Sequence, residues 1–179
     1  MNIEKLFSTK ERVNILNEII YLEKEFGVNE IARKVRLSKG LISKYFNILL
    51  KENLIRKKKN KFVVKINSEV KSIRIMLNIQ KIEIKIFKKY KFIKSVGLYG
   101  SCIKGVNTES SDIDLWIKIE NTKEEELAEL TSELRKKIRN IKIIVLDDKK
   151  IEKLKRQDLL FYHSLYFGSI ILYGRENGI

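Results

Sequence analysis

The sequence predicts an α+β protein with two domains: a mostly helical domain over residues 1–67, then a small mixed sheet with flanking helices over residues 68–179. Apolar residues recur at helical spacing across residues 9–52. The total of 179 residues is enough for two small domains, each with its own core. Runs rich in β-branched and aromatic residues, typical of strands, follow at residues 92–99, 115–119 and 141–146.

Composition and charge limit the function classes. The chain carries a formal net charge of +15 and has one cysteine and one histidine. These numbers exclude an internal disulfide framework and a zinc site. No stretch approaches the roughly 20 apolar residues of a membrane span, and the N-terminus lacks a signal-peptide core. We therefore expect a cytoplasmic protein without a membrane segment.

Three helices are expected in the first domain. The first ends at Gly27, a residue type typical of the position after a helix. A short second helix covers residues 28–35, and Ser38 is a typical N-cap for a third helix over residues 39–52. Residues 54–66 then surround a basic tip, and this pattern predicts a hairpin.

Three helices followed by a basic hairpin resemble a winged helix-turn-helix domain. The resemblance implies that the helix from Ser38 to Lys51 reads the major groove of DNA while the hairpin contacts the phosphate backbone. Residues 1–67 hold sixteen Lys and Arg against seven Asp and Glu, and this net charge of +9 suits phosphate contacts. Docking of RNA or of a protein is the alternative. The candidate DNA-binding residues are Ser38, Lys39, Ser43, Lys44, Asn47, Lys57, Lys58, Lys59 and Lys61.

The second domain contains a pair of carboxylates at strand spacing. Asp112 and Asp114 are two residues apart at the start of an apolar run, so on a strand both side chains face the same side. Two carboxylates that face together repel each other unless a cation lies between them. Oxygen ligands that leave room for water and phosphate suit Mg²⁺, so both residues are candidate metal ligands and catalytic residues.

A Gly-Ser turn precedes the acidic pair by ten residues. Gly100 lets a phosphate approach the backbone closely, and successive N–H groups there can form an anion-binding nest. The Ser101 hydroxyl adds a donor, and Lys104 adds a positive charge. Metal-binding carboxylates opposite a phosphate cradle are the layout of nucleotidyl-transfer sites. Gly100, Ser101 and Lys104 are therefore the candidate nucleotide-binding residues.

The run from Leu98 to Ser101, together with Ser111 to Leu115, resembles the signature of minimal nucleotidyltransferases of the DNA polymerase beta superfamily. The resemblance covers roughly residues 69–179. It implies transfer of a nucleoside monophosphate, with Mg-ATP as the expected donor, to a protein tyrosine or another hydroxyl. Minimal nucleotidyltransferases of similar spacing act as antitoxins that adenylylate a partner toxin, which would imply a cognate partner protein here.

The chain departs from that family at a third acidic position on a later strand. Lys142 aligns with the third carboxylate, and a lysine there would repel a metal and cannot act as a base unless its pKa is strongly lowered. Asp147 or Asp148 could substitute. If neither does, the alternative is a DNA-binding regulator whose second domain binds nucleotide without catalysis. A third possibility is a domain that only forms a homodimer.

Several other expectations concern the second domain. Residues 67–90 are expected to form one helix, although Lys81–Ile86 alternates like a strand. Thr122 is expected to cap a helix that runs to Arg139. Trp116 shares the face of the acidic pair, but core packing is the preferred interpretation. Cys102 is not expected to act as a nucleophile.

Overall fold

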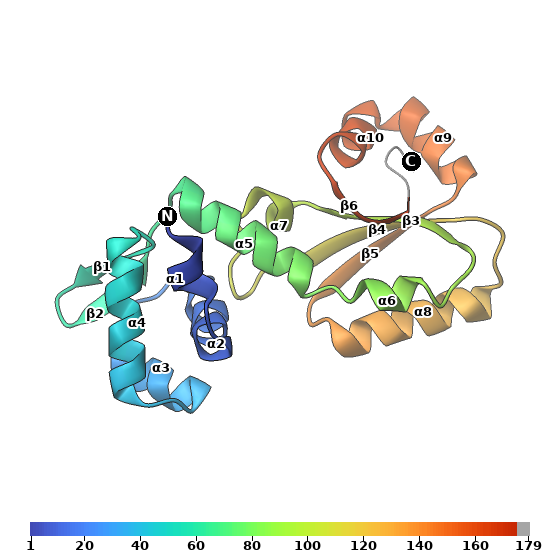
Figure 1. The fold of residues 1–179 in the computed structure, drawn as a ribbon. Helices are drawn as coiled ribbons and strands as arrows, with labels where there is room; N and C mark the ends of the chain where they lie inside the picture. Colours follow the sequence, from blue (N-terminus) through green and yellow to red (C-terminus); the bar gives the residue numbers. More distant parts are fainter. Residues whose placement is uncertain (175–179) are drawn as a thin grey trace. The chain divides into compact units, whose positions relative to one another are not determined.

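The computed structural model describes residues 1–174, and the chain divides into two compact units, Met1–Arg74 and Ile75–Ile179. Helix α5 (Ser68–Gln80) contains the boundary between them (Figure 1). Among the described residues, no helix combines the length and apolar character that crossing a bilayer requires.

Helices precede a two-stranded hairpin in the first unit. Ser38 caps its fourth helix, where the hydroxyl accepts a hydrogen bond from Leu41 N at 3.3 Å. The two strands are antiparallel, with Lys58 opposite Lys61 across the turn. The helices and the hairpin predicted for residues 28–66 are therefore confirmed. The elements are α1 (Ile3–Phe7), α2 (Lys10–Ile19), α3 (Val28–Val35), α4 (Lys39–Lys51), β1 (Ile55–Lys58) and β2 (Lys61–Val64).

The predicted end of the first long helix was wrong. Helix α2 ends at Ile19, and Gly27 is the N-cap of α3 rather than the residue after α2. Phe26 leaves the helix because its backbone pairs with Phe62 through two hydrogen bonds of 2.9 and 2.8 Å. The rings of Phe26 and Phe62 also pack around Phe46 of α4, with centroids 5.6 and 4.9 Å from it. This aromatic core joins the hairpin to α4.

A four-stranded mixed sheet forms the centre of the second unit. Its order is β5-β4-β3-β6, in which β4 and β5 are parallel and the other neighbours are antiparallel. This agrees with the mixed sheet that the sequence predicts. The strands are β3 (Ile93–Tyr99), β4 (Ile113–Ile119), β5 (Ile141–Leu146) and β6 (Ile170–Gly174).

Helices cover both faces of the sheet (Figure 1). On one face, α6 (Ile84–Phe87) and α8 (Glu124–Lys137) contribute Phe87 and Leu130 to a fully buried core. On the other, α9 (Asp148–Gln157) and α10 (Leu159–Tyr166) pack against Trp116. A short helix, α7 (Ser101–Lys104), follows β3 directly.

Two local predictions in this unit were wrong. The expected helix over residues 67–90 is interrupted between α5 and α6, because Ile82 turns into the core where the alternating segment begins. The N-cap of α8 is Lys123 rather than Thr122. The Thr122 hydroxyl instead lies 2.9 Å from Glu126 Oε2 and donates to it.

Candidate functional site

The two halves of the Gly-Ser and acidic motif meet at one end of the strand pair β3–β4. Gly100 follows β3, Asp112 precedes β4, and Tyr99 lies opposite Asp114 in the antiparallel register. A Cβ added to Gly100 would lie 2.4 Å from Asp114 Oδ2, so the turn and the carboxylate are in direct contact. The structure therefore brings Gly100, Ser101, Asp112 and Asp114 together.

The backbone of the turn needs glycine. Gly100 has φ 75° and ψ −144°, a region that residues with a Cβ rarely adopt. Ser101 begins α7, so its backbone N–H is one of the donors at that helix end that has no partner within the helix. Lys104 is exposed at the other end of α7. These are the donors that a phosphate group would need.

Two buried asparagines, Asn78 and Asn107, hold this loop. Asn78 on α5 donates to the Cys102 carbonyl at 2.9 Å. Its side chain also exchanges hydrogen bonds of 2.9 and 3.1 Å with Asn107. Sequence reasoning missed both residues. The one hint in the sequence is that Asn78, a polar residue, follows Leu77 in a helical segment that is otherwise rich in apolar residues.

Cys102 is a packing residue. Its side chain is fully buried, and burial raises the pKa of the thiol to about 11. The thiol therefore stays protonated near neutral pH, which makes it a poor nucleophile. Its sulfur lies 3.5 Å from the Asp112 carbonyl and joins the turn to the acidic segment.

Lys142 lies where the third carboxylate was expected. The parallel register of β4 and β5 places it opposite Asp114, and its Nζ is 2.6 Å from Asp112 Oδ2. A hydrogen bond and charge attraction from Asp112 raise the pKa of Lys142, so it is a poor proton acceptor.

Asp147 and Asp148 have other roles. Asp147 caps α9 by accepting a hydrogen bond from Lys150 N at 2.7 Å, and Asp148 pairs with Lys118 at 3.3 Å. The prediction that one of them replaces the third carboxylate is not supported. Across residues 1–174, no group of three His, Cys, Asp or Glu side chains is arranged to hold a metal ion.

The carboxylates of Asp112 and Asp114 have different environments. Burial raises the pKa of Asp114, Lys142 lowers it, and the like charge of Asp112 raises it further. Because the folded-state pKa is raised, ionisation of Asp114 costs stability as pH rises above the usual aspartate range. The Asp112 side chain keeps 38% exposure. Two carboxylates could hold one Mg²⁺ if phosphate and water oxygens supplied its other ligands.

Trp116 is a core residue, as preferred from the sequence. Its side chain is fully buried on the face covered by α9 and α10. The indole N–H donates to Ser169 Oγ at 2.9 Å. Gly97 lies opposite it on β3, where any Cβ would meet the ring. Trp116 therefore has no free face for stacking on a base.

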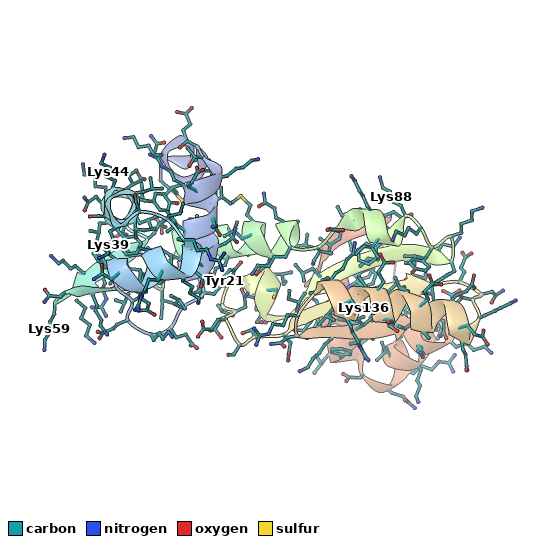
Figure 2. All side chains as sticks on the ribbon, turned by 90° about the horizontal axis from the view of Figure 1, so that it is seen from below. Tyr21, Lys39, Lys44, Lys59, Lys88 and Lys136 are labelled. Carbon is teal, nitrogen blue, oxygen red and sulfur yellow. The ribbon has the colours of Figure 1, made fainter. Side chains whose placement is uncertain are left out.

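The candidate nucleic-acid residues lie on the exposed face of α4 and on the hairpin. The opposite face of α4 is buried, and Tyr45 donates from its hydroxyl to the Leu6 carbonyl at 3.0 Å. Figure 2 shows Lys39, Lys44 and Lys59 on the same side of the first unit. The exposed set is Ser38, Lys39, Ser43, Lys44, Asn47, Lys57, Lys58, Lys59 and Lys61.

Lys58 differs from the other hairpin lysines. Its Nζ lies 2.6 Å from Glu25 Oε1, so its charge has a partner within the chain. That hydrogen bond also lowers the pKa of Glu25. The Glu25 carboxylate therefore competes with any other anion for Lys58.

Comparison with known proteins identifies a family for the second unit. The sequence model of the family described as polymerase beta, nucleotidyltransferase matches residues 80–176. No curated protein matches the chain.

Three solved structures are similar to the chain at low identity. A chain from a toxin-antitoxin crystal structure with AMP-PNP has 18% identity and a TM-score of 0.41, over 56% of this chain and 76% of that one. A chain from the tri-AMPylated Shewanella oneidensis HEPN toxin in complex with MNT antitoxin has 17% identity and a TM-score of 0.37, over 57% and 75%. A protein described as a nucleotidyltransferase, from Sulfolobus solfataricus, has 22% identity and a TM-score of 0.38, over 64% and 95%.

Proposed function

The chain belongs to the polymerase beta nucleotidyltransferase family, and we propose that its second unit transfers a nucleoside monophosphate from an Mg-bound triphosphate, with ATP as the expected donor, to a hydroxyl group. The observation that carries this proposal is the contact between the Gly100 turn and the Asp114 carboxylate. It supports the proposal because the candidate phosphate-binding turn lies directly beside the two candidate metal ligands.

Each residue of the proposed site has a separate role. Asp112 and Asp114 would hold Mg²⁺, which when bound neutralises charge on the phosphates. The backbone N–H and hydroxyl of Ser101 would donate to phosphate oxygens, and Gly100, which has no Cβ, lets the turn lie against Asp114. Lys104 adds positive charge at the end of α7.

The absence of a third carboxylate limits which kind of hydroxyl group can act as the acceptor. In the transfer, the acceptor oxygen bonds the α-phosphorus, pyrophosphate leaves, and the hydroxyl proton must be released. Lys142 cannot take that proton, because a lysine ammonium paired with an anionic oxygen, whether of a carboxylate or of a phosphate, stays protonated. A phenol, with a pKa of about 10, loses its proton more readily than an aliphatic hydroxyl. A tyrosine of a cognate partner protein is therefore the acceptor that this site suits best.

Asp112→Asn is expected to reduce transfer by on the order of 10³-fold, because it removes a metal ligand and its charge. Transfer of radiolabelled AMP to tyrosine-containing acceptors checks this. DNA binding by the same variant should be unchanged, since Asp112 belongs to the second unit. Full transfer by Asp112→Asn would contradict the assignment.

A second candidate function is nucleotide binding without transfer. The observation that favours it is the pairing of Lys142 with Asp112, which leaves no third acid beside the pair within the described residues. In that case, ATP and Mg²⁺ bind, and no acceptor is labelled by the wild-type protein. Nucleotide would then act by changing the affinity of the first unit for DNA.

For the first unit, we propose a DNA-binding winged helix with α4 as the recognition helix and β1–β2 as the wing. The pairing of Phe26 with Phe62 supports this, because it fixes the hairpin against the helices. Lys39 and Lys44 of α4 and Lys59 of the hairpin turn share one side of the unit (Figure 2). Such a surface suits contact with the phosphate backbone of DNA.

Replacing Lys57 and Lys59 by alanine is expected to weaken DNA binding by about tenfold at moderate salt and to lower the salt slope by about 2. Lys58→Ala is the control, and because of its pairing with Glu25 it should lower the slope by less than the decrease of about 1 that is expected for one unpaired lysine. Fluorescence anisotropy with labelled duplexes over a range of salt concentrations measures both quantities. An unchanged slope for the double variant would exclude the hairpin as a phosphate contact.

A further inference from the structure

One basic side chain lies inside the candidate metal site. Lys142 Nζ is 2.6 Å from Asp112 Oδ2, and the β4–β5 register places Lys142 directly opposite Asp114. An ammonium bound to a carboxylate oxygen competes with any metal ion for that oxygen. The Lys142 side chain is 67% exposed, so it can leave Asp112 without disturbing the core.

The charges of the free site argue against tight metal binding by the protein alone. Asp112, Asp114 and Lys142 together carry one net negative charge when all are ionised. A divalent cation keeps its water unless several anionic oxygens replace it. A triphosphate supplies those oxygens and also offers the ammonium another anionic partner.

We propose that Lys142 makes metal binding depend on nucleotide, and this inference rests on the proposed function of the site. Without nucleotide, Lys142 holds Asp112. When a nucleoside triphosphate binds, Lys142 moves to a phosphate oxygen and leaves Asp112 available as a ligand. The step exchanges one ion pair for another, and no covalent bond changes.

The exchange has a thermodynamic consequence. Metal and nucleotide both favour the state in which Lys142 has left Asp112. Each must therefore tighten the binding of the other by the same factor. Removing the ammonium makes Asp112 available in the free protein, so metal alone should bind more tightly and the coupling should shrink. An exposed ion pair adds little to stability, so the fold should tolerate the change.

The test is calorimetric titration of Mn²⁺ into the full chain, with and without a non-hydrolysable ATP analogue. We expect Lys142→Ala to raise the affinity for Mn²⁺ alone by about tenfold and to reduce the metal–nucleotide coupling by about tenfold. Lys118→Ala is the matched control. It removes the same charge from the same sheet, and its partner is Asp148 at 3.3 Å. It should change neither quantity.

Two negative outcomes can be told apart. If nucleotide binds with metal but Lys142→Ala and Lys142→Gln both keep the wild-type affinity and coupling, the role of Lys142 is wrong and the proposed function stands. If neither the wild type nor any variant binds the analogue with metal, the proposed function itself fails, and this inference fails with it. Thermal unfolding of each variant verifies that the fold is intact.

Discussion

Gly97→Ala is expected to destabilise the second unit by about 3 kcal/mol, because the added methyl group would lie 2.2 Å from Trp116 Cε2. The indole cannot easily move away. It is fully buried against Leu146 and Leu165, and its N–H donates to Ser169 at 2.9 Å. Overpacking against a held aromatic ring is among the larger effects of a single substitution.

Trp116 is the only tryptophan of the chain, so its fluorescence reports on the second unit alone. We expect the unfolding midpoint to fall by about 10–20 °C. Trp116→Leu should cancel part of the cost of Gly97→Ala, because contacting residues are not additive. An unshifted midpoint would show that Trp116 does not occupy this position.

Gly100→Ala is expected to weaken ATP binding by at least about tenfold. Its backbone conformation, φ 75° and ψ −144°, strains any residue with a Cβ, and the methyl group would lie 2.4 Å from Asp114 Oδ2. Either the turn or the carboxylate must move. Both belong to the proposed site, so the loss should appear in binding as well as in stability.

Gly27→Ala is the matched control for this substitution. Gly27 has an extended backbone, and nothing lies within 4 Å of an added Cβ. Calorimetric titration of both variants with Mg-ATP gives the comparison. Wild-type affinity in Gly100→Ala would mean that the turn does not contact the nucleotide.

Local patterns in the sequence were sufficient to predict many of the helices and strands. Ser38 predicted the start of α4 because its hydroxyl satisfies a free backbone N–H at the helix end. The strand-like runs predicted β3 and β5, where periodicity and residue type agree. The spacing of Asp112 and Asp114 predicted a shared face, which follows from strand geometry alone.

The features that the sequence did not predict correctly depend on contacts between segments that are far apart in the chain. Phe26 continues the helical spacing of α2, but its pairing with Phe62, thirty-six residues later, ends that helix much earlier. The Asn78–Asn107 pair could not be predicted either, because it forms only once α5 and the loop after α7 are packed. The position of Lys142 was predicted, whereas its contact with Asp112 required the structure.

The central claim is that Asp112 and Asp114 form a metal-dependent nucleotide site, and calorimetric titration of ATP in the presence and absence of Mg²⁺ tests it most directly. The comparison protein is the Asp112→Asn/Asp114→Asn variant, with circular dichroism to verify its fold. We predict binding by the wild type that requires Mg²⁺ and is lost in the variant. Equal binding by both proteins, or none by either, would contradict the claim.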